Sequence, residues 1–135
     1  MKKFLFVPLL ALVLSACAGT AARENVLLPS MLQVWPRIAI QVHDGATAAV
    51  AAAEIPAETL LVIDRESERM LDALERSDLL ALASVNWSGL RPYAIRNIQD
   101  RTNAGQIGAG VAATLVERIK QFDLSYDLAT KARNR

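Results

Sequence analysis

Few side chains in this sequence are suited to chemistry, and the first candidate is His43, which directly precedes the carboxylate of Asp44. It is the only histidine among the 135 residues. A catalytic histidine needs a nucleophile and an orienting group that the fold brings within hydrogen-bond distance, and no sequence pattern supplies them here. We therefore expect His43 to be a solvent-facing residue on a helix, and we expect a protein with no catalytic residues.

Metal and cofactor sites find equally little support. A single cysteine excludes a disulfide within the chain and a site built from several thiolates, while the carboxylates are spaced as on helix surfaces. Gly105, Gly108 and Gly110 precede a helical segment, as in a phosphate-binding loop, but no Gly-Lys-Ser/Thr follows and no strand precedes them. We expect no metal and no cofactor, and we expect Gly105, Gly108 and Ala112 to let their helix approach the alanines of residues 46–53.

The lone cysteine, Cys17, ends a segment with the features of an export signal. Lys2 and Lys3 precede an uncharged apolar run of 11 residues, from Phe4 to Leu14. A run of this length suits the core of a signal peptide and is too short to span a hydrocarbon layer of about 30 Å. The sequence thus predicts an exported protein.

The residues Leu14-Ser15-Ala16-Cys17 resemble the lipobox of bacterial lipoproteins, which places small residues before an obligatory cysteine. The resemblance implies that a diacylglyceryl group is attached to the Cys17 sulfur and that the chain is cut before Cys17. Several acyl chains give a stable membrane anchor, because each buried methylene contributes about 0.8 kcal/mol. The alternative is ordinary secretory cleavage near Ala16 or Ala18, which would leave a free thiol.

The resemblance also bears on where the protein lies. Ala18 follows the cysteine where lipoproteins retained in the inner membrane of many Gram-negative bacteria carry aspartate. This favours the outer membrane, with the domain facing the periplasm rather than the cell surface. The predicted division is a signal peptide at 1–16, the lipidated cysteine and a flexible tether at 17–25, and a small helical domain at 26–135.

Apolar residues recur every three or four positions along the rest of the chain, which predicts helices. The first helix has such a face from Leu28 to Ala53, with a kink or break expected near Val34–Trp35 because of Pro36. The second starts at Ile55-Pro56 and reaches residue 76, with a charged outer face. Asp78 is a predicted N-cap for a short third helix.

The remaining segments continue this pattern. Residues 86–89 are expected to form a turn, Arg91-Pro92 to open another helix, and residues 102–105 to interrupt it. The last helix is expected to begin at Ile107 and to end near residue 122, with residue 132 as the alternative end. The predicted fold is all-α, an irregular antiparallel bundle of four or five helices.

The aromatic residues should supply the largest core side chains of a domain otherwise rich in alanine and leucine. They are Trp35, Trp87, Tyr93, Phe122 and Tyr126. The alternative is that Trp35 or Trp87 lies on a partner surface or at the membrane-facing end.

Together these features predict a non-catalytic, lipid-anchored envelope lipoprotein that binds a protein partner or helps to organise the envelope. The protein would bind the membrane through acyl chains on Cys17. Self-association of the chain is a further option. A formal net charge of +1 gives no reason to expect nucleic acid. The alternative function is that of a lipid-anchored carrier or sensor of an apolar small molecule, held between helices.

Overall fold

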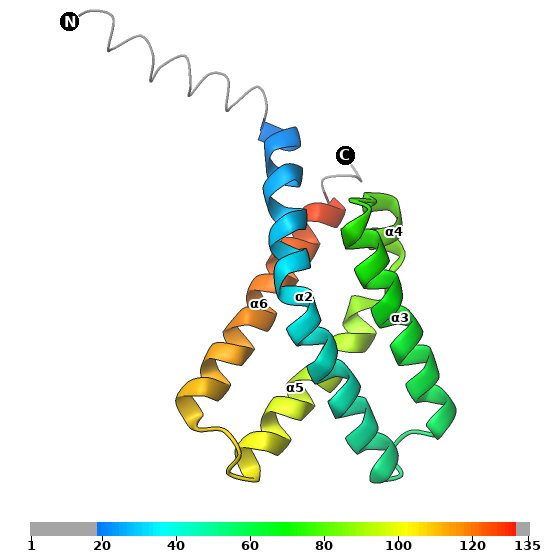
Figure 1. Cartoon of the computed structure of the whole chain (residues 1–135), viewed down its shortest axis with the longest axis vertical. Helices are drawn as coiled ribbons and strands as arrows, with labels where there is room; N and C mark the ends of the chain where they lie inside the picture. Colours follow the sequence, from blue (N-terminus) through cyan, green and yellow to red (C-terminus); the bar gives the residue numbers. More distant parts are fainter. Residues whose placement is uncertain (1–18, 132–135) are drawn as a thin grey trace, which may run out of the picture.

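The computed structural model describes residues 19–131, and their side chains from residue 26 onward. This part of the chain forms five helices and no strand: α2 (Gly19–Ala51), α3 (Ala57–Glu75), α4 (Leu79–Ser84), α5 (Trp87–Asn103) and α6 (Ala109–Lys131) (Figure 1). The predicted all-α bundle is confirmed. The signal peptide at 1–16 and Cys17 lie outside the described residues.

Helix α2 is the central element of the bundle. It makes its most extensive contacts with α5, followed by α3 and then α6, and Figure 1 shows α3 and α6 on its two sides. Its buried apolar residues follow the predicted helical face, and they are Leu28, Met31, Trp35, Ile38, Val42, Ala46 and Ala49. The face ends there, because the helix stops at Ala51 and Ala53 has a positive φ of 58°.

Of the kink or break expected near Val34–Trp35, the break does not occur, while Figure 1 shows α2 changing direction along its length. Helix α2 continues through both Pro29 and Pro36, although each proline removes one intrahelical hydrogen bond. Trp35 and Ile38 are buried on either side of Pro36, so packing holds both halves of the helix against the same core. The helix also begins at Gly19 rather than after a tether, since Ala21, Ala22 and their neighbours are good helix formers.

The boundaries of the later helices follow their capping residues. The Asp78 carboxylate accepts a hydrogen bond from the Ala81 backbone N–H, which confirms it as the N-cap of α4. Helix α5 starts at Trp87 instead of Arg91, because the Asn86 side chain caps it by accepting from the Gly89 N–H. The predicted turn at 86–89 is therefore the first turn of a helix.

Three aromatic side chains from three helices meet at the centre of the core. Trp35 of α2 lies against Trp87 of α5, with ring centroids 6.1 Å apart, and against Phe122 of α6 at 5.5 Å. Trp87 and Phe122 pack edge to face at 4.8 Å. All three are at most 5% exposed, which confirms the predicted core role and places neither tryptophan on the surface.

Asp123 of α6 fixes one side of this aromatic group. Its carboxylate accepts a hydrogen bond of 2.6 Å from Trp87 Nε1 and one of 2.7 Å from Arg91 Nε. Both donors belong to α5, so one carboxylate ties the start of α5 to the middle of α6. The buried indole N–H thereby has a partner, which a tryptophan in a core requires.

Helices α2 and α5 approach each other closely at Gly45. A Cβ atom at this position would lie 1.8 Å from the Tyr93 carbonyl oxygen of α5. The predicted close contact of Gly105 and Gly108 with residues 46–53 is wrong, because a Cβ at Gly105, Gly108 or Gly110 would meet nothing within 4 Å. At Gly45, α2 thus approaches α5, while the three glycines before and at the start of α6 lie in open space.

Tyr126 joins α6 to the end of α4, and its loss gives a measurable prediction. Its hydroxyl donates to the carbonyl oxygens of Leu82, at 3.2 Å, and Val85, at 2.8 Å. Both carbonyls keep a backbone donor without it. Tyr126→Phe should therefore lower the free energy of unfolding by only about 1 kcal/mol, as measured by urea denaturation. An unchanged value would show that these bonds contribute nothing.

The same hydroxyl makes stability depend on alkaline pH. Burial raises the pKa of Tyr126 above its usual 10.0, and the nearby charges of Asp127 and Glu66 raise it further. A raised folded-state pKa means that the contribution of the neutral phenol is complete below pH 10 and is lost as the pH rises through the folded-state pKa. Tyr126→Phe should flatten the fall in stability above pH 10.

Candidate functional site

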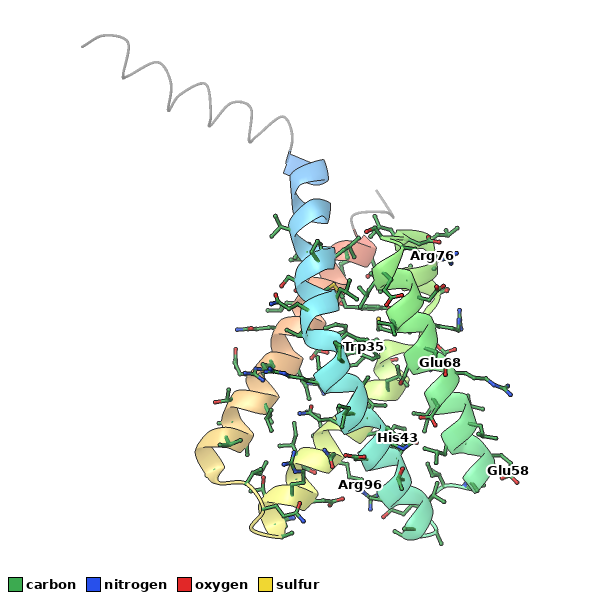
Figure 2. All side chains as sticks on the ribbon, viewed as in Figure 1. Trp35, His43, Glu58, Glu68, Arg76 and Arg96 are labelled. Atoms are coloured by element: carbon green, nitrogen blue, oxygen red, sulfur yellow. The ribbon has the colours of Figure 1, made fainter. Side chains whose placement is uncertain are left out.

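His43 lies on the outer surface between α2 and α3, where its partner is a different carboxylate from the one next to it in sequence. Its Nδ1 lies 2.9 Å from Asp64 Oδ1, and the two side chains are 52% and 38% exposed. The nearby Thr47 hydroxyl donates to the backbone carbonyl of His43, so it does not contact the imidazole. The pair joins α2 to α3, and Figure 2 shows His43 on the part of α2 that lies next to α3.

Charged residues of α3 make contacts that the sequence does not show. Glu66 pairs with Arg69, as its spacing predicts, but its other carboxylate oxygen accepts from the Asn86 N–H at 3.0 Å. Arg69 Nη2 also donates to Ser84 Oγ at 2.9 Å. This part of the charged face therefore holds the connection between α4 and α5, and is not only solvated surface.

The sequence raises two other kinds of site, a lipidated cysteine and a metal site. Cys17, the predicted lipidation site, lies outside the described residues. Between residues 19 and 131, no three histidine, cysteine, aspartate or glutamate side chains gather as metal ligands would.

A candidate interaction surface is the amino-terminal half of α6, residues 109–118. The predicted apolar face of this helix is buried at Ile119, Phe122 and Ala129, but Val111 on the same face is 54% exposed. Leu115 is only partly buried. Figure 1 shows the start of α6 diverging from α2 toward its connection with α5. The apolar face thus extends beyond the part of the helix that the bundle covers.

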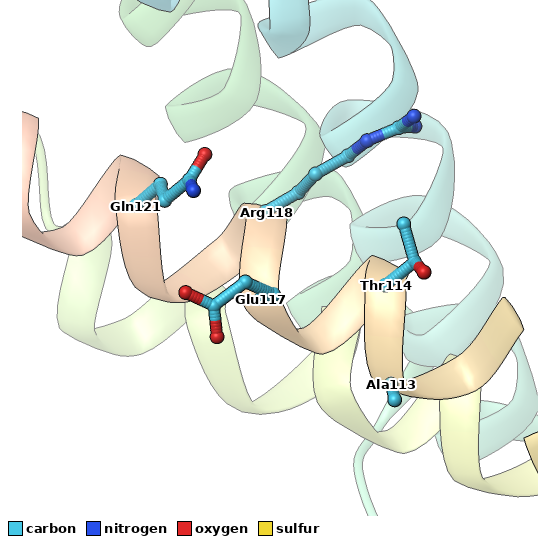
Figure 3. A pocket seen from close by; sticks show the side chains of 5 residues that line it. All are labelled: Ala113, Thr114, Glu117, Arg118 and Gln121. Atoms are coloured by element: carbon cyan, nitrogen blue, oxygen red, sulfur yellow. The ribbon is translucent and has the colours of Figure 1, made fainter. Parts of the chain in front are cut away.

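Open depressions flank this half of α6. The one toward α5 has a volume of about 470 Å³, and its lining mixes apolar and polar residues: Ile98, Gln99, Thr102, Asn103, Ala112, Ala113 and Val116. A second, of about 440 Å³, lies along the helix surface between Ala113 and Gln121 (Figure 3). A third, of about 200 Å³, lies between α2 and α6 and is lined by Gln33, Val34, Arg37 and Arg118.

None of the helices within residues 19–131 is long and apolar enough to cross a membrane. Comparison of the chain with protein-family models, with curated proteins and with solved structures gives no match.

Proposed function

We propose that this chain is a non-catalytic lipoprotein of the bacterial envelope, held at the outer membrane through acyl chains on Cys17 and facing the periplasm. Its helical domain binds a protein partner and so helps to organise the envelope. Support for the anchor comes from the sequence Leu14-Ser15-Ala16-Cys17 and the apolar run before it. Support for partner binding comes from the surface of the domain.

The observation that carries the partner proposal is the uncovered apolar face at residues 109–118. A helix of a small domain is expected to bury its apolar face along its length, and α6 does so only in its second half. Leu115 packs against the core but is only partly buried, and Val111, one turn earlier, continues this face into solvent at 54% exposure. Exposed apolar surface of this kind beside polar residues is typical of protein interaction sites.

Site-directed crosslinking in cells tests this proposal. A photoreactive amino acid replaces Val111 in the full-length protein, and a matched control replaces Leu61 of α3, because the two positions are 54% and 59% exposed. We expect Val111 to give one dominant crosslinked protein, identified by mass spectrometry, and Leu61 not to give it. The additional change Leu115→Glu should remove the product.

Other outcomes of that experiment would contradict the proposal. Equal products from Val111 and Leu61 would show that crosslinking reports only crowding at the membrane. A product made of two copies of this chain would assign the surface to self-association. No product from Val111 would exclude this half of α6 as the partner surface.

A carrier of an apolar small molecule has weaker support. The depression between α5 and α6 offers Ile98, Ala112 and Val116 as apolar contacts, but Gln99, Thr102 and Asn103 also line it and it is open to solvent. A bound apolar molecule would therefore keep much of its surface in water. Ligand sites normally bury most of the ligand, so partner binding is the better account.

A further inference from the structure

We propose that the depression between α2 and α6 is a binding site for a phosphate-class oxyanion, which Arg37 and Arg118 hold between them. This inference concerns a different feature from the partner surface and does not depend on it. It starts from the lining of the depression, to which two arginines from distant parts of the chain contribute their side chains.

Arg37 and Arg118 lack the carboxylate partners that four other arginines have, and Arg65 and Arg101 lack them too among the side chains of residues 26–131. Arg69, Arg76, Arg91 and Arg96 each form an ion pair with a carboxylate. Within the side chains described, residues 26–131, no carboxylate lies within 4.0 Å of Arg37 or Arg118, and none lines the depression. Two positive groups that share a small space repel each other, and an anion between them removes this cost.

The orientation of Arg118 is set by its helix. Figure 3 shows the Arg118 side chain extending toward α2, whereas the neighbouring Glu117 points in another direction. Leu115 lies one turn before Arg118 on the same side of α6. The Arg118 side chain therefore points toward the depression between α6 and α2. Arg37 reaches the gap from α2.

The chemistry of the lining selects an oxyanion. A guanidinium is a planar fork of N–H donors that matches the oxygens of phosphate or carboxylate, and it keeps its charge at all physiological pH values. The Gln33 side chain can add an amide donor from one turn before Arg37. A volume of about 200 Å³ accommodates a small anion and a few waters, since each water takes about 30 Å³.

The position of the site limits how a lipid phosphate could reach it. Arg37 is 18 residues beyond Gly19, so it lies about 27 Å along α2 from the start of that helix. Headgroups beside an anchored Cys17 would reach the site only if α2 lay along the membrane surface. A diffusible phosphate has no such restriction, and the two sources can be separated experimentally.

The test is a titration of the mature lipidated protein with inorganic phosphate in a nonionic detergent, at constant ionic strength. Nitrogen-15 NMR follows the Nε–H signals of the arginines. We expect saturable shifts at Arg37 and Arg118, with affinity about tenfold weaker in Arg37→Gln and in Arg118→Gln. Arg65→Gln is the matched control, because it removes the same charge from an exposed site on α3 and should leave the affinity unchanged.

Detergent micelles mixed with phospholipid distinguish a lipid headgroup from free phosphate as the source of the anion. If phosphatidylglycerol, but not phosphatidylcholine, shifts the same two signals and prevents the response to free phosphate, the site takes a lipid headgroup. If only free phosphate acts, the ligand is diffusible. The proposal is overturned if no saturable shift occurs at Arg37 and Arg118, or if Arg65→Gln weakens binding as much as the two site variants do. Neither result would alter crosslinking from Val111.

Discussion

Replacing Gly45 by alanine is expected to destabilise the domain by about 3 kcal/mol or more. The added Cβ would lie 1.8 Å from the Tyr93 carbonyl oxygen and 2.7 Å from its carbonyl carbon. These are backbone atoms of α5, which cannot rotate away as a side chain does. Helices α2 and α5 would have to separate, and this would loosen the most extensive helix contact in the bundle.

Urea denaturation followed by circular dichroism measures this effect. Small domains have total stabilities near the lower end of 5–15 kcal/mol, so a loss of about 3 kcal/mol should lower the denaturation midpoint strongly. Gly110→Ala is the matched control, because a Cβ there would meet nothing within 4 Å and should leave the stability unchanged or slightly higher. A Gly45→Ala protein as stable as the wild type would show that the two helices do not approach this closely.

The sequence predicts the structure best where apolar residues repeat at helical spacing. The buried faces of α2 and α3 follow this spacing through Trp35, Val42, Ile63 and Leu74, because period alone determines which residues share a helix side. The local N-cap of α4 was also predictable, since Asp78 needs only the backbone three residues ahead. Helix caps and buried helix faces are predictable because both depend on residues that lie close together in the sequence.

Features that depend on which helices become neighbours were not predictable. The glycines near 105–110 looked suited to close packing, but the residue that needs to be glycine is Gly45, because α5 and not α6 crosses there. The partner of His43 is Asp64, 21 residues away, and not the adjacent Asp44. Arg37 and Arg118 are also far apart in sequence, and only folding brings them to the lining of the same depression.

The start of α5 was mispredicted for a different reason. Asn86 and Gly89 suggested a turn, and Pro92 suggested the first turn of a helix that begins at Arg91. The Asn86 side chain instead caps the Gly89 N–H, and burial of Trp87 and Leu90 holds the first turn in place. Tertiary packing thus extends the helix by one turn ahead of its proline.

Substitution of Cys17 by serine should remove the protein from the membrane fraction completely. The thioether to diacylglycerol requires a thiol, and a serine hydroxyl is not modified in its place. A single acyl chain would bind membranes only weakly, whereas loss of all acyl chains leaves no comparable attraction.

The variant must be separated from one that merely misfolds or is not exported. Ser15→Ala keeps the cysteine and two small residues before it, so it should be lipidated and membrane-bound like the wild type. The Cys17→Ser domain should keep its helical circular dichroism spectrum, because residue 17 precedes every described helix.

The most direct measurement is metabolic labelling with a radioactive fatty acid, followed by separation of the membrane and soluble fractions. The account predicts that the wild-type chain carries the label and sediments with the outer membrane, while Cys17→Ser carries no label and is recovered in the soluble fraction. A Cys17→Ser protein that remains in the membrane fraction, or a wild-type chain without label, would contradict the proposed anchor.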